Sequence, residues 1–88
     1  MDQERINRLI EIADALWLSD GKNAAGASTG ELAAAAVLCG RIDWSGYDLP
    51  DGRVAIYQLY HRIRDWWPGL IDLADSWLPP GNEDRGSR

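Results

Sequence analysis

The chain has 88 residues, of which 45% are hydrophobic, and its formal net charge is −5 at pH 7. This length suits one small domain with a modest core, because so short a chain buries roughly 60% of its unfolded surface. The acidic balance disfavours long-range attraction to a phosphate backbone or an anionic membrane. The longest apolar run, Leu32 to Cys39, is far shorter than the roughly 20 residues of a transmembrane helix. A single cysteine excludes an internal disulfide, so we expect a reduced, cytoplasmic protein.

The first segment, from Asp2 to about Ser19, has the spacing of an amphipathic helix. Its apolar residues recur at intervals of three and four and are Ile6, Leu9, Ile10, Ala13, Leu16 and Trp17. Asp2 is placed to cap this helix, and Arg8 is spaced to pair with Glu11. The glycine-bearing stretch 20–27 predicts a linker.

A second helix is predicted after Ser28, which opens an S-x-x-E capping box with Glu31. No polar residue interrupts the run from Leu32 to Cys39, so this Ala-rich helix is expected to be buried at the centre of the fold. Gly40 stands where a left-handed C-terminal cap belongs.

A third helix is expected to begin near residues 50–51, after a connector over 41–50, and to end near residues 66–67 because Pro68 follows. Its predicted core stripe is Ile56, Leu59, Tyr60, Ile63 and Trp67. A fourth segment, 68–78, repeats the helical pattern. We therefore predict an all-α fold, a single domain of three to four helices over residues 1–80, with a flexible tail at 81–88.

Catalytic chemistry has little support in the sequence. The only histidine, His61, lies four residues before Asp65, and a carboxylate at this spacing can orient a base. Such a pair is more often a solvated contact on a helix surface. Cys39 ends an apolar run, where cysteines are usually buried and inert. One histidine and one cysteine do not fill a zinc shell, so we expect no enzyme, no metal and no cofactor.

DNA binding is an alternative function. The predicted third helix carries side chains that reach bases or phosphates in DNA-binding proteins, namely Arg53, Gln58, Arg62 and Arg64. The helix before it is slim enough to serve as the first half of a helix-turn-helix. The connector is longer than that motif allows, and the net charge is negative, so a nucleic-acid partner is disfavoured.

Protein binding is the function that the composition favours. The chain has five tryptophans, three tyrosines and no phenylalanine, and tryptophan, tyrosine and arginine are enriched at interface hot spots. The candidate partner-binding residues are Trp44, Tyr47, Trp66, Asp43, Asp48 and Asp65. Two adjacent helical residues do not face one core, so either Trp66 or Trp67 is expected at a rim. Alternatively, Trp44 and Tyr47 fold back as lids on the core. The acidic residues around them would steer the domain toward a basic partner.

Self-association, as a homodimer, is a third interpretation. An exposed helix face carrying Trp66 or Trp77 would favour it.

One stretch of the chain resembles a known group of proteins. It reads Thr29-Gly30-Glu31-Leu32-Ala33-Ala34-Ala35-Ala36-Val37-Leu38 and is followed by Gly40-Arg41 and Asp43-Trp44. It resembles small uncharacterised helical proteins encoded by phages, prophages and plasmids of proteobacteria. The likeness covers residues 28–67. It implies an accessory protein of a mobile element. Such proteins are often inhibitors, anti-CRISPR proteins among them, so the resemblance implies an inhibitor that binds host defence machinery such as a CRISPR-Cas complex.

Overall fold

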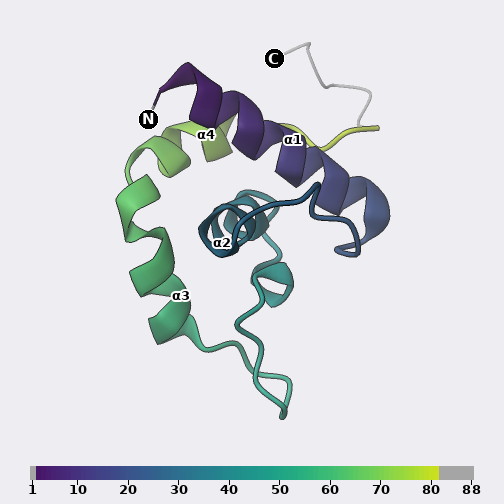
Figure 1. The fold of residues 1–88 in the computed structure, drawn as a ribbon, viewed down its shortest axis with the longest axis vertical. Coiled ribbons are helices and arrows are strands. Elements are labelled where there is room, and N and C mark those ends of the chain that lie inside the picture. The colour runs from purple at the N-terminus through teal and green to yellow at the C-terminus, as the bar shows by residue number, and fades with distance from the viewer. Residues whose placement is uncertain (1, 82–88) are drawn as a thin grey trace.

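A computed structural model of the chain describes residues 2–81, and this part is all-α, as predicted. Its elements are α1 (Gln3–Ser19), α2 (Thr29–Leu38), the 3-10 turn η1 (Ile42–Trp44), α3 (Ile56–Ile63), the 3-10 turn η2 (Arg64–Trp66) and α4 (Gly69–Ser76) (Figure 1). The extended pairing within residues 2–81 is a single bridge between Asp48 and Val54. The predicted tail lies outside the described residues, apart from Gly81.

Helix α1 begins and ends with local caps. The Asp2 carboxylate accepts a hydrogen bond from the Arg5 amide at 2.8 Å, as the N-cap prediction requires. At the other end Asp20 adopts the left-handed conformation, with φ of 56°, and its amide donates to the carbonyl of Leu16. The buried side chains of the helix are Leu9, Ile12, Ala13 and Leu16. Their spacing of three and four places one stripe of α1 against the rest of the domain.

Helix α2 is the central element, and both of its predicted caps are present. The Ser28 hydroxyl accepts from the Glu31 amide, and the Glu31 carboxylate accepts from the Ser28 amide. Gly40 has a φ of +71°, and the Arg41 amide just beyond it donates to the carbonyl of Ala36. Helix α2 contacts α1, α3, α4 and η1, and alanines 33–36 are fully buried. Their small side chains let these neighbours approach closely.

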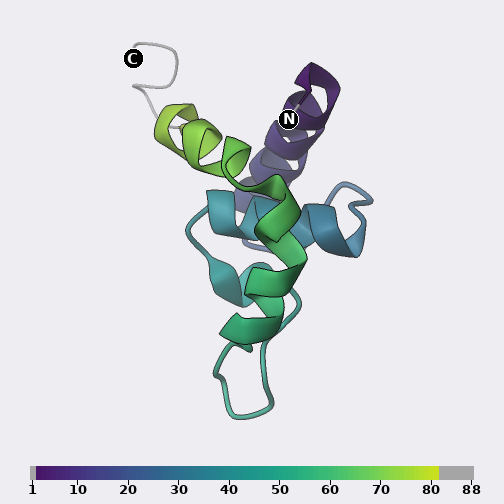
Figure 2. The ribbon, with the colours of Figure 1, turned by 90° about the vertical axis from the view of Figure 1, so that its left-hand side faces the viewer.

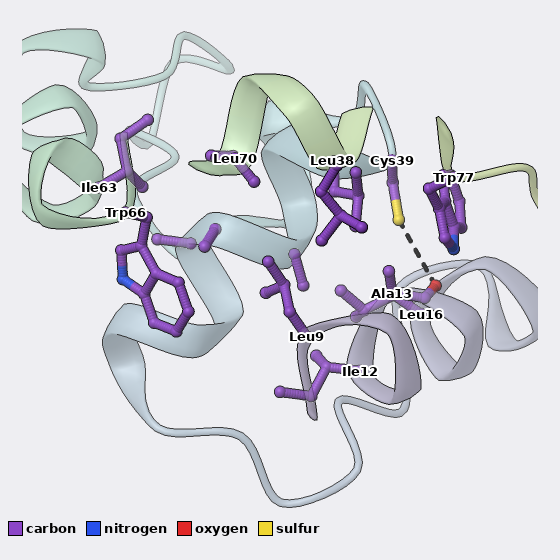
Figure 3. Packing of buried hydrophobic residues seen from close by; sticks show 14 of the residues in the cluster. Leu9, Ile12, Ala13, Leu16, Leu38, Cys39, Ile63, Trp66, Leu70 and Trp77 are labelled. Atoms are coloured by element: carbon purple, nitrogen blue, oxygen red, sulfur yellow. Dashed lines mark hydrogen bonds between the residues drawn. The ribbon is translucent and has the colours of Figure 1, made fainter. Parts of the chain in front are cut away.

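The core forms around α2, where α1, α3, η2 and α4 contribute buried side chains. Figure 3 shows Leu9, Ile12 and Leu16 of α1 pointing toward side chains of the other elements, with Trp66 at one end and Trp77 at the other. At the second end the Trp77 indole donates to the Asp14 carboxylate at 3.0 Å. That bond ties the residue following α4 to α1, because a buried indole N–H needs an acceptor.

Helix α3 starts later than the sequence predicts. Residues 47–55 instead form a loop in which Leu49 donates to the carbonyl of Arg53 and Ala55 donates to that of Tyr47. The Asp51 carboxylate accepts from the Arg53 amide at 3.1 Å, so it stabilises the turn of this loop rather than a helix end. The prediction of a start near residues 50–51 is therefore wrong, and the connector runs over 39–55 rather than 41–50.

The break between α3 and α4 lies where the sequence predicts it. After η2, Trp67 adopts extended backbone angles, φ −82° and ψ 137°. Proline restricts the preceding residue to this region, so Pro68 ends the helical run and α4 follows at once. Figure 2 shows α3 crossing in front of α2, with α4 continuing from its upper end. The outer side of α3 therefore forms part of the molecular surface.

Candidate protein-binding surface

Large apolar side chains are exposed mainly on one stretch of the chain. Of the eight exposed large hydrophobic residues in the described part of the chain, five come from residues 56–71. These five are Ile56, Tyr57, Tyr60, Trp67 and Ile71. Three of them lie on α3. Tyr60 follows Tyr57 by three residues and Ile56 by four, so its side chain neighbours both on the helix surface. We call these three residues the α3 face.

The α3 face is exposed because the apolar arc of the helix is wider than its contact with the core. Leu59 and Ile63 are buried against the domain, with 3% and 5% of their surfaces exposed. On the neighbouring strip of the same helix, Ile56 and Tyr60 are 55% and 59% exposed, and Tyr57 is 76% exposed. The predicted core stripe is thus correct at two positions and wrong at Ile56, Tyr60 and Trp67. Helix α2 covers only one side of α3.

Trp66, a predicted partner-contact residue, lies in the core. Its side chain is 9% exposed, and the Arg5 guanidinium lies 4.0 Å from the centre of its ring. Trp67 is 47% exposed. The prediction that one member of this pair lies at a rim is confirmed, but the member is Trp67. The assignment of Trp66 to the surface is wrong because η2 turns its indole inward.

A groove runs beside the α3 face and holds two of the predicted residues. It measures about 370 Å³ and is lined by Tyr47, Tyr57, Gln58, His61, Arg62 and Asp65. The Arg62 Nε donates to the Tyr47 hydroxyl at 2.9 Å. This bond joins α3 to the connector and makes Tyr47 the far wall of the groove. Tyr47 is half-buried and also packs against the core, as the lid interpretation predicts.

His61 makes ring contacts with two tyrosines of α3. Its ring centre is 4.6 Å from that of Tyr57 and 5.9 Å from that of Tyr60, both in edge-on geometry. Within residues 2–81, the imidazole makes no hydrogen bond or ion pair with Asp65. The structure therefore brings His61 into an aromatic group rather than into the base–carboxylate pair that its spacing allows.

Trp44 belongs to a separate group of side chains, the tryptophan cluster, formed by Trp17, Trp44 and Trp77. The Trp17 ring centre is 6.4 Å from that of Trp44 and 6.1 Å from that of Trp77. The Arg41 guanidinium lies 4.4 Å above the Trp44 ring. Trp44 is half-buried against the core and is thus also a lid.

Asp43 and Asp48 lie apart from the groove. Both oxygens of Asp43 accept hydrogen bonds from Arg41, at 3.1 and 2.9 Å, and these bonds lower the pKa of the carboxyl group. Asp43 is therefore already paired within the chain. Asp48 is exposed and lies in the loop before α3, bridged to Val54. Of the six predicted partner-contact residues, the structure brings only Tyr47 and Asp65 into one site.

Cys39 is buried, with its Sγ 3.5 Å from the carbonyl oxygen of Ala13. Burial raises the pKa of its thiol to about 11, so the group is protonated at neutral pH and is a weak nucleophile. Within residues 2–81, no three His, Cys, Asp or Glu side chains are grouped so as to hold a metal ion. None of the helices in this range is long and apolar enough to cross a membrane.

Comparisons with protein-family models, with curated proteins and with solved structures gave no match for this chain. The candidate surface is therefore assigned from the geometry of this chain alone.

Sequence reasoning missed the α3 face because it assigned Ile56 and Tyr60 to the core. One signal was available. The apolar residues at 56, 57, 59, 60 and 63 span an arc too wide for one neighbouring helix to cover. Two of them are tyrosines, whose hydroxyl groups tolerate contact with solvent.

Proposed function

We propose that the protein is a protein-binding module and that the α3 face, with the groove beside it, is its docking surface. The observation that carries this proposal is the exposure of Ile56, Tyr57 and Tyr60 together on one ordered helix. Exposed groups of large apolar residues mark interaction sites in small proteins, because water contact with them is costly. Tyrosine is among the residues that contribute most to binding at interface centres.

The α3 face is held firmly by the rest of the domain. Leu59 and Ile63 anchor the inner side of the helix, and the bond between Arg62 and Tyr47 fixes its flank. A preformed surface loses little conformational entropy on binding. Anchors at i, i+1 and i+4 on a helix suit a partner that lays a helix or groove along it.

The DNA-binding alternative gains less support. Arg53 is engaged by Asp51, with the Arg53 Nη2 2.7 Å from a carboxylate oxygen, and Arg62 is engaged by Tyr47. The connector over 39–55 also exceeds the short turn of a helix-turn-helix.

Two other expectations stay predictions. Inhibition of host defence machinery is implied only by the resemblance over residues 28–67, and the exposure of the α3 face does not bear on it. An exposed Trp66 or Trp77 would favour self-association, but each of these residues is only 9% exposed.

The test replaces both tyrosines, Tyr57→Ala and Tyr60→Ala, in the full chain. Tagged wild-type protein is used to capture partners from a lysate of the native host, and each captured protein is then purified and its affinity measured. We expect the double variant to lose at least roughly tenfold in affinity, since hot-spot tyrosines contribute more than about 1 kcal/mol each.

The matched control is Leu18→Ala, which removes another exposed apolar side chain, 72% exposed, from the end of α1. It should leave the affinity unchanged. Circular dichroism should show that all variants keep their helical content. Equal binding by wild type and the tyrosine variant would refute the proposed surface, and light scattering of the wild type alone would reveal whether the captured partner is a second copy.

A further inference from the structure

The segment that carries the α3 face differs in charge from the rest of the chain. Residues 53–65 hold three arginines and the only histidine against one aspartate, in a chain whose net charge is −5. The basic residues are Arg53, His61, Arg62 and Arg64, and the acidic one is Asp65. A partner that approaches the α3 face therefore meets a locally positive helix on an acidic molecule.

The arginines of this segment are not equally available. Arg53 forms an ion pair with Asp51, and Arg62 donates to Tyr47 inside the groove. Arg64 is exposed and forms no ion pair with any of residues 2–81. It lies one turn beyond Tyr60, so its guanidinium is the available cation at the C-terminal end of the α3 face. His61, one turn beyond Tyr57, lies beside it.

One acidic side chain lies near the α3 face, and the others lie at the opposite end of the helix. Asp65 lines the groove together with Tyr57, His61 and Arg62, so it offsets one of the two arginines of this end, Arg62 and Arg64. Asp48 and Asp51 belong to the loop before the helix. The C-terminal end of the α3 face thus combines exposed aromatic surface with an excess of positive charge, two arginines against one aspartate.

We infer that the occupant of the α3 face is an acidic amphipathic protein segment, which packs apolar side chains on Tyr57 and Tyr60 and places carboxylates against Arg64 and His61. This inference rests on the proposed function and specifies the chemistry of its partner. Complementary charge sets the orientation of a complex and speeds encounter. It reverses the sequence-based expectation of a basic partner. Asp43 is paired within the chain, Asp48 lies in the loop before α3, and Asp65 is outnumbered by Arg62 and Arg64 at the C-terminal end of the helix.

A nucleic acid would also offer negative charge and stacking bases. It needs a row of available cations that follows its backbone, since each phosphate contact requires one. Among residues 2–81, the α3 face offers one unpaired arginine, Arg64, on a protein whose overall charge repels phosphate. A protein segment with two or three carboxylates needs fewer cations than a nucleic acid and therefore fits the α3 face better.

The test uses a random library of helix-forming 16-residue peptides displayed on yeast, selected against the folded full chain at low salt. Each enriched peptide is synthesised and its Kd measured by titration with wild type and with Tyr57→Ala/Tyr60→Ala, Arg64→Glu and Arg53→Glu variants. Arg53→Glu changes the net charge by the same amount as Arg64→Glu but alters a paired residue in the loop. A fluorescent oligo(dT) is titrated in parallel.

We expect enriched peptides with net negative charge that bind through the two tyrosines. Their affinity should fall roughly tenfold in Arg64→Glu, much less in Arg53→Glu, and progressively as salt is added. Peptides that depend on Tyr57 and Tyr60 but are neutral or basic would overturn the acidic-partner inference and leave the proposed function standing. Failure to enrich any peptide that depends on those tyrosines would count against the docking surface itself. Tyrosine-dependent binding of oligo(dT) in preference to the peptides would overturn the assignment to a protein partner.

Discussion

Trp66 and Trp67 are neighbours in the chain, yet the Trp66 indole is packed in the core beneath the Arg5 guanidinium while the Trp67 indole is half exposed. The backbone changes from a 3-10 turn to an extended conformation between them. This change sends two bulky aromatic side chains to opposite environments within one residue. One stabilises the fold, and the other is among the large apolar side chains exposed over residues 56–71.

The two tryptophans should therefore differ in their contribution to stability. Trp66→Ala should lower the free energy of unfolding by about 3–5 kcal/mol, because it leaves a large cavity and an uncovered Arg5. A domain of this size has a total stability of roughly 5–15 kcal/mol, so the substitution should remove a large share of it. Trp67→Ala should cost less than about 1 kcal/mol. Urea denaturation followed by circular dichroism measures both values, and similar losses would contradict the placement of these residues.

Gly21 should be intolerant of a side chain because Trp44 lies directly over it. A Cβ at Gly21 would be 2.5 Å from Trp44 Nε1, and its φ of +84° is already strained for other residues. We expect Gly21→Ala to displace the Trp44 ring, to disturb its contact with Trp17, and to destabilise the domain by roughly 2–4 kcal/mol.

The matched control for that substitution is Gly52→Ala. Gly52 has a similar φ of +89° but nothing within 4 Å of its Cβ position, so it carries the backbone strain alone. It should cost only about 1 kcal/mol. Near-ultraviolet circular dichroism reports the tryptophan packing. If both variants shift the spectrum equally, Trp44 does not pack on Gly21.

Glu31 should make the stability of the domain dependent on acid. Hydrogen bonding to the Ser28 backbone, with the nearby charges of Arg8 and Arg5, lowers the pKa of this carboxyl below its ordinary value of 4.5. A depressed folded-state pKa contributes stability above about pH 4.5, and this contribution is lost as the pH falls through the folded value. Wild type should therefore lose stability on acidification more steeply than Glu31→Gln.

Glutamine at position 31 keeps an oxygen that can accept from Ser28 but carries no charge. The other carboxylates are common to both proteins, so the difference between their curves of unfolding free energy against pH isolates Glu31. Chemical denaturation at several pH values from neutral to acidic gives these curves. Parallel curves would show that the Glu31 charge does not stabilise the folded state.

Much of the local structure could be predicted from the sequence. The cap at Asp2, the capping box between Ser28 and Glu31, the left-handed Gly40 and the break at Pro68 are all present. Each depends on side chains and backbone within about four residues, so the interaction is visible in the sequence itself. The central position of α2 was predictable too, since an uninterrupted apolar helix has no wet side.

The late start of α3 was not predictable in this way. A proline and an aspartate suit a helix N-terminus, but here Asp51 supports a loop that also depends on the backbone pairing between Leu49 and Arg53. The residues around Pro50 and Asp51 favour a turn as strongly as they favour the start of a helix. The contacts of this loop with the rest of the chain decide which of the two forms.

The candidate surface was also predictable only in part. By itself the sequence determined that α3 has a wide apolar arc, because helical periodicity sets the angle of each side chain about the axis. Only the tertiary structure decided which part of that arc is covered. Leu59 and Ile63 are buried in the core cluster, while Tyr57 and Tyr60 stay exposed, because α2 and the connector cover only part of the circumference of α3.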